Sequence, residues 1–117
     1  MNPSSALLVQ VEAAQGAAAV GNSEAANFLI IVTDATGVGV GNLTQKQIAV
    51  INHFTVAGQT TGFSNNITFF NNVGGGAYHV QVKLVKAGKW VAGSYLAQIV
   101  VAGTNQQGQG TATLVVR

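Results

Sequence analysis

Very few side chains in this sequence could take part in acid–base or nucleophilic chemistry. The only carboxylates are Glu12, Glu24 and Asp34, and the chain contains no cysteine. Glycosidic hydrolysis needs two carboxyl groups placed across one bond, and a cysteine nucleophile or a thiolate zinc site needs a thiol. Asp34 begins a turn sequence, and hydrogen bonds between its carboxylate and the downstream backbone give it a structural role there. We therefore expect no catalytic residue and predict that the protein is not an enzyme.

Two histidines, His53 and His79, are the remaining candidates for metal binding. Two histidines and a carboxylate can hold a transition metal, whereas a hard cation such as Ca²⁺ needs several carboxylates. The two histidines fall on separate expected strands, where an unpaired histidine is more often structural. His79 lies on the polar face of its strand and is expected to be solvated, while His53 could face either the core or the surface. We expect neither a metal nor a cofactor.

Serine and glycine motifs add no chemistry. Ser94 lacks the flanking glycine of the G-x-S-x-G nucleophile turn. The glycines Gly37, Gly39 and Gly41 have G-x-G spacing, but the third glycine of a dinucleotide site and its downstream acidic residue are missing. This glycine series predicts a turn.

Aromatic side chains are the better candidates for binding. Tyr78 is expected to act as a structural tyrosine corner, with a buried ring and a hydroxyl bonded to the backbone. For Trp90 and Tyr95 core packing is favoured. The alternative is an exposed platform on which a sugar stacks, since aromatic rings offer apolar faces at low entropy cost. Phe69 and Phe70 are adjacent in an expected strand, so one of the two must leave the core face.

Charged residues are scarce throughout the chain. They make up 7% of it, and five Lys or Arg against three Asp or Glu give a net charge of +2. The only basic cluster is Lys83, Lys86 and Lys89, whereas a nucleic-acid footprint needs a broad basic stripe with interleaved aromatics. No window approaches the ~18 apolar residues of a membrane span, and residues 1–9 carry no secretory-signal pattern. We expect no nucleic acid as partner and no membrane insertion.

The elements that must position these residues follow a period of two, which is typical of strands. Strands are expected at 6–12, 28–33, 48–56, 66–70, 77–84, 94–102 and 111–116. A turn is expected at 44–47 and loops at 13–26, 58–65 and 104–110. Ile48, Ile51 and Phe54 also fit helical spacing, but alternation and β-branched residues favour a strand there. Seven strands joined by Gly and Asn turns predict one all-β domain over residues 1–117, a seven-stranded antiparallel immunoglobulin-like sandwich with residues 1–5 flexible.

Three segments carry a family resemblance that covers roughly residues 28–116. Residues 32–44, VTDATGVGVGNLT, resemble the VTDANGNPVTGLT signature of bacterial immunoglobulin-like domains of the invasin and intimin type. Residues 76–82, GAYHVQV, are similar to the GxYxVxV strand of that family, and residues 90–95, WVAGSY, are similar to its W-x-x-G-x-Y entry to a late strand. Gly39 stands where the family has proline, and Asn42 where it has glycine. The resemblance implies a stalk domain, an adhesin tip or a domain that decorates a phage particle.

The low charge is the main functional signal. Soluble monomers normally stay apart through surface charge and protect their sheet edges with lysine or proline. We therefore predict a structural, interaction-type domain that assembles with itself or with a larger scaffold. We expect it outside the cell, at its surface or on a virion, with a cytoplasmic location as the open alternative. The alternative is a carbohydrate- or receptor-binding module that uses Trp90, Tyr95 and the Asn- and Gln-rich loops 58–66 and 104–110.

Overall fold

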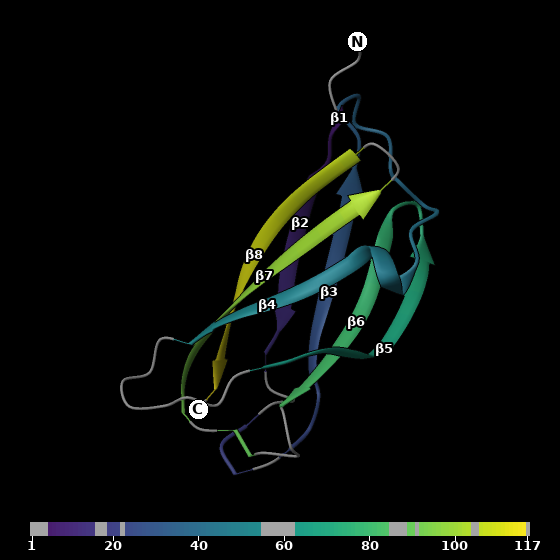
Figure 1. Cartoon of the computed structure of the whole chain (residues 1–117). Helices are drawn as coiled ribbons and strands as arrows, with labels where there is room; N and C mark the ends of the chain where they lie inside the picture. Colours follow the sequence, from purple (N-terminus) through teal and green to yellow (C-terminus); the bar gives the residue numbers. More distant parts are fainter. Residues whose placement is uncertain are drawn as a thin grey trace.

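A computed structural model describes residues 5–15, 19–21, 23–54, 63–84, 89–90, 92–103 and 106–116. Nearly all of the regular structure is β-strand, arranged in two layers (Figure 1). Sheet A has the strand order β1-β8-β7-β4 and sheet B the order β2-β3-β6-β5. The bounds are β1 Ser5–Ala6, β2 Leu8–Ala14, β3 Ala26–Thr33, β4 Ile48–Phe54, β5 Phe63–Gly74, β6 Ala77–Leu84, β7 Gly93–Gly103 and β8 Gln106–Val116, with a short 3-10 helix η1 at Gln45–Gln47.

The strand order confirms the predicted sandwich. β1 and β2 are successive parts of one N-terminal segment that joins first one sheet and then the other, so the topology is that of seven strands. The order β2-β3-β6-β5 opposite β8-β7-β4 is that of the constant-type immunoglobulin sandwich. All pairings are antiparallel except the short parallel contact between β1 and β8.

The core lies between the sheets and is built by strict alternation. In β3 the residues Phe28, Ile30 and Val32 are fully buried, while Leu29 and Ile31 between them face outward. β6 and β7 repeat the pattern with their own alternate residues. Because successive side chains of a strand point to opposite faces, each strand contributes one apolar row to the core.

Phe69 and Phe70 divide between the two faces of sheet B, as predicted. Phe69 is 43% exposed, whereas Phe70 packs against the core and stacks on Tyr78 with ring centroids 5.7 Å apart. The expected turn at 44–47 and the strand that begins at Ile48 are also confirmed.

Two of the expected loops are wrong in part. Residues 106–110 belong to β8 and residues 63–65 to β5, which also continues beyond the expected end of its strand at Phe70. The Gln-Gly repeat of β8 has the composition of a loop, but its glycines serve a close crossing of strands. A Cβ atom on Gly108 would lie 2.2 Å from the Leu7 carbonyl oxygen, and one on Gly110 would lie 2.3 Å from that of Val9. The glycines are therefore required where β2 passes over β8.

A close contact of the same kind explains the glycine at position 39. A Cβ atom there would lie 2.0 Å from the carbonyl oxygen of Gly75, in the turn between β5 and β6. Gly76 adopts φ +94° in this turn, and its carbonyl accepts a hydrogen bond from Val32 N. The β5–β6 turn therefore rests directly on the connection that leads from β3 to β4.

Candidate functional site

Trp90 and Tyr95 lie in the core and offer no ring face to a ligand. Each is only 2% exposed, and their rings meet edge to face with centroids 5.1 Å apart. Trp90 Nε1 donates a hydrogen bond to the Glu24 carbonyl at 2.8 Å, and the Trp90 carbonyl accepts one from Gly21 N at 3.0 Å. The favoured interpretation of core packing agrees with this burial, and an exposed stacking platform does not.

The polar loops of the alternative binding module do not complete such a site either. Residues 58–62, 104 and 105 lie outside the described residues. Residues 106–110, which were to supply a second loop, are the first half of β8.

Tyr78 ties the β3–β4 connection to the core. Its ring is fully buried, and its hydroxyl accepts a hydrogen bond from Leu43 N at 3.1 Å and donates one to the Val40 carbonyl. A tyrosine corner bonds the backbone a few residues upstream, whereas these partners lie 35 and 38 residues away. Asn72 adds a second anchor, because its Nδ2 donates to the Gly41 carbonyl at 2.8 Å.

The three carboxylates do not converge. Glu24 and Asp34 lie beyond opposite ends of β3, and Glu12 pairs with Leu29 near the middle of that strand. At about 3.3 Å per residue, the five positions from Leu29 to Asp34 put the Cα atoms of Glu12 and Asp34 roughly 16 Å apart. A glycosidase pair requires carboxyl groups no more than about 9.5 Å apart.

Asp34 is occupied by its own turn. Its Oδ1 accepts hydrogen bonds from the Thr36 hydroxyl at 2.6 Å, from Thr36 N at 2.9 Å and from Val38 N at 3.1 Å. The bond from the Thr36 hydroxyl, followed by those from the backbone N–H groups, lowers the pKa of Asp34 below its ordinary value. This is the local turn role that the sequence predicts.

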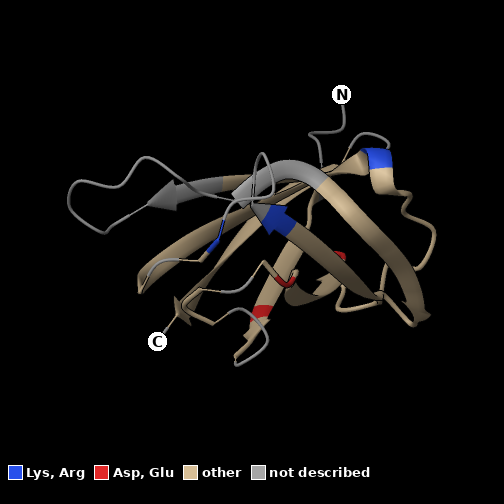
Figure 2. Ribbon diagram, turned by 90° about the horizontal axis from the view of Figure 1, so that it is seen from below, with Lys and Arg blue, Asp and Glu red and all other residues tan. Residues whose placement is uncertain are grey.

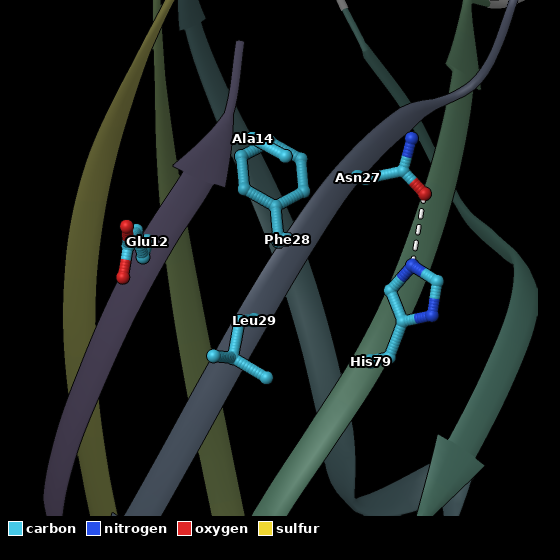
Figure 3. Close-up of a pocket in the computed structure, with 6 residues that line it drawn as sticks. All are labelled: Glu12, Ala14, Asn27, Phe28, Leu29 and His79. Atoms are coloured by element: carbon cyan, nitrogen blue, oxygen red, sulfur yellow. Dashed lines mark hydrogen bonds between the residues drawn. The ribbon is translucent and has the colours of Figure 1, made fainter. Parts of the chain in front are cut away.

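His79 lies beside an open groove of about 400 Å³ on the outer face of sheet B (Figure 3). Glu12 and His79 flank Leu29 across three neighbouring strands, because each of them pairs with Leu29. Two strand spacings separate the carboxylate from the imidazole, about 9–10 Å between their backbones. The groove therefore places one acid and one base on either side of an apolar residue, without direct contact between them.

The surroundings of His79 correct the expectation that it is merely solvated. The ring is half-buried, its Nε2 lies 2.8 Å from Asn27 Oδ1, and its edge meets Phe69 at a centroid distance of 5.3 Å. Gln81 Nε2 also donates to Asn27 Oδ1, at 2.9 Å. Because that oxygen is an acceptor, His79 Nε2 is the donor, and the imidazole is part of a structural network.

The second histidine is remote from the first. His53 lies in β4 of sheet A opposite Leu96, and its side chain falls outside the described residues. Over the described part of the chain, no three His, Cys, Asp or Glu residues gather into a group that could hold a metal ion. Nor does that part contain a helix long and apolar enough to cross a membrane.

Sheet A is distinguished by the absence of charge. Its strands β1, β4, β7 and β8 contain no Lys, Arg, Asp or Glu. In sheet B only Glu12 and Lys83 are charged, and the other charges of the described chain lie in the connections (Figure 2). The outer surface of sheet A exposes Ile51 by 44% and Val115 by 36%, among threonine, glutamine and alanine.

The β8 edge of sheet A is contacted at its start, at its two glycines and near its end. At its start Ser5 and Ala6 of β1 pair with Gln106 and Gln107, and the β2 crossing follows at the two glycines. At its end Gln15 acts as a short substitute strand. The Gln15 side chain donates from Nε2 to the Thr113 carbonyl at 3.1 Å and accepts from Val115 N at 2.9 Å.

The opposite side of the sandwich presents the terminal strands β4 and β5. The β5 pairing with β6 is interrupted by three register shifts, and Gln45 Nε2 donates to the Ile67 carbonyl of β5 at 3.0 Å. β4 pairs with β7 in continuous register over all seven residues and ends the sheet on that side. Its sequence, IAVINHF, contains no charge, proline or glycine.

Comparisons with protein-family models, with curated proteins and with solved structures found no match. The resemblance of residues 32–44, 76–82 and 90–95 to bacterial immunoglobulin-like domains therefore stays a prediction. The candidate functional feature is a surface, namely the uncharged sheet A together with its terminal strand β4.

Proposed function

We propose that this protein is a non-catalytic structural domain that assembles with copies of itself or with a larger scaffold. A fibre, a surface stalk, or a decoration on a capsid or appendage would each use such a domain, and each places it outside the cell, at the cell surface or on a virion. The observation that carries the proposal is that all strands of sheet A lack charged residues.

A surface of this kind favours association for two physical reasons. Soluble domains typically carry charged residues at about a quarter to a third of their surface positions, and mutual repulsion keeps copies apart. Sheet A lacks that repulsion, and burial of its exposed Ile51 and Val115 removes apolar area from water. Its Thr and Gln side chains form hydrogen bonds without carrying charge, as Gln98 Nε2 does to Gln109 Oε1 at 2.6 Å.

The geometry gives less support to the other functions. Sugar binding on Trp90 and Tyr95 would need exposed rings, and both are buried. Carboxylate catalysis would need two converging acids, whereas Glu12 lies in β2 and Glu24 and Asp34 lie beyond opposite ends of β3. A structural role needs neither feature.

The test is the mass of the purified chain in solution across a concentration series. We expect the average mass to rise with concentration and to fall again on dilution, because the association is reversible. Added salt should leave the transition in place or favour association, since no ion pairs of sheet A are available to be screened. A chain that stays monomeric throughout and binds no scaffold contradicts the proposal.

A further inference from the structure

We propose that β4 is the edge through which two copies of this chain pair, antiparallel and about a two-fold axis, to form one continuous sheet from two copies of sheet A. This inference rests on the proposed function and specifies its contact. The partner is a second copy of the chain, and the contact is the backbone of β4 Ile48–Phe54.

The first argument is by elimination among the sheet edges. The β8 edge is occupied by β1, the β2 crossing and the side chain of Gln15. β2, the terminal strand of sheet B on the same side, is the strand that makes that crossing. β5 is broken by register shifts, which interrupt the regular spacing of backbone groups that a pairing strand needs. β4 is regular over its whole length and ends its sheet.

The second argument concerns the sequence of the strand. Proteins commonly protect an exposed edge with lysine, proline or a bulge. β4 has none of these. Four of its seven residues are Ile, Val or Phe, which favour strands, and short uncharged segments without Pro or Gly are prone to pair with copies of themselves. Lys46, the nearest preceding charge, lies in η1 before the strand begins.

The third argument identifies the partner as a second copy. Under a two-fold axis each residue of β4 faces another residue of the same strand, and no like charges meet because there are none. Among the side chains of β4 that the structure describes, the outward ones are Ala49 and Ile51, and both are exposed in the single chain. Pairing would cover the apolar Ile51 with its own counterpart.

The geometry also limits the size of the assembly. Among the described residues, β4 is the one regular strand whose outer backbone edge pairs with nothing, so pairing through β4 closes a dimer and does not propagate a filament. A contact over seven residues of one strand is at the small end of protein interfaces, so the dimer should be concentration-dependent.

The experiment measures the dimerisation midpoint of three chains by sedimentation, from about 10 μM to about 1 mM. The test variant is Ile51→Lys, which places two lysines beside the joint. The matched control is Val115→Lys, since Val115 has similar exposure on the outer face of the same sheet, two strands away. Unfolding curves in urea establish that each variant is folded, and Ala49→Lys replaces Ile51→Lys if that variant is not.

We expect a wild-type dimer, a midpoint at least about tenfold higher for Ile51→Lys, and a midpoint within about threefold of wild type for Val115→Lys. Equal shifts in both variants would overturn the edge contact in favour of packing through the sheet A face. An unchanged midpoint in both variants would also overturn the β4 edge contact. Either of these two results would leave the proposal of a self-assembling domain intact. A wild-type chain that is monomeric at every concentration would remove both the contact and the self-association.

Discussion

The two edges of the sandwich, one at β8 and the other at β4, are stabilised by different kinds of contact. On the β8 side the sheets are joined by backbone contact, with β2 crossing β8 where Gly108 and Gly110 leave no space for a side chain. On the β4 side the connections are held by side-chain hydrogen bonds. The Tyr78 hydroxyl accepts one from Leu43 N and donates one to the Val40 carbonyl, and the Gln45 amide donates one to the Ile67 carbonyl. The first arrangement closes an edge, and the second leaves β4 as the terminal strand of its sheet.

The difference shows how a protein with little charge can limit its own association. An edge can be protected by charge or by occupation, and this chain uses occupation on the β8 side. Gln15 is a clear case, because one side-chain amide supplies the donor and acceptor that a neighbouring strand would supply. An edge that carries no charge and that no described residue pairs with is then available for a partner.

The largest loss of stability is expected from a side chain introduced at Gly110, where β2 crosses β8. Gly110→Ala should lower the free energy of unfolding by about 3 kcal/mol, because the new Cβ would lie 2.3 Å from a backbone oxygen that cannot move alone. Gly41→Ala is the matched control on the other side, where the nearest atom lies 3.9 Å away. It should change stability by less than about 1 kcal/mol. Urea denaturation measures both, and equal losses would show that the crossing is not tight.

On the open side, Tyr78→Phe tests the side-chain anchor. The variant keeps the buried ring but leaves the buried Leu43 N–H without its acceptor, so we expect a loss of about 2 kcal/mol in the free energy of unfolding. The measurement is again urea denaturation, with near-ultraviolet circular dichroism to show that the core is retained. A loss below about 0.5 kcal/mol would mean that the connection to β4 does not depend on this anchor.

Gln15→Ala removes the side-chain amide that bonds the backbone of Thr113 and Val115 at the β8 edge. It should cost about 1 kcal/mol, because two exposed hydrogen bonds are lost. It should also expose Thr113 and Val115 as a second pairing edge, so that species larger than a dimer appear in sedimentation. Gln10→Ala, at an exposed position of β2, is the control and should change neither property. A variant that remains a dimer would show that the β8 edge does not need Gln15 to stay closed.

The smallest effect concerns the turn that leaves β3 toward β4. Because hydrogen bonds lower the pKa of Asp34 in the folded chain, its contribution to stability is fully present above the unfolded-state value near 3.9 and is lost as the pH falls through the folded value. The stability advantage of wild type over Asp34→Asn should therefore shrink as the pH falls below about 4. An advantage that grows toward low pH, or does not change, would contradict this account of the turn.

Local sequence patterns were sufficient to predict the fold class and several of its turns. Alternation predicts the buried row of β6, and the Asp34 turn follows from the tendency of aspartate to bond its own downstream backbone. The turn before β4 was likewise predictable. Each of these features depends on residues within a few positions of one another.

Features that depend on distant contacts were not predictable. The first half of β8 has the composition of a loop, and only its crossing with β2 about 100 residues away explains its glycines. His79 has a local pattern that predicts solvation, but its partner Asn27 lies 52 residues upstream on the neighbouring strand. The sequence allows Trp90 and Tyr95 to be either buried or exposed. Their burial depends on contacts between distant residues, such as the hydrogen bond from Trp90 to the Glu24 carbonyl before β3.

The most direct test of the central claim is amide hydrogen exchange of the wild-type chain as a function of its concentration. The account predicts that amides of β4 exchange more slowly as dimer forms, while those of β8 Gln106–Val116, already closed within the monomer, do not change. Added protection that appears in β8 or evenly over the face of sheet A, with none in β4, would contradict it.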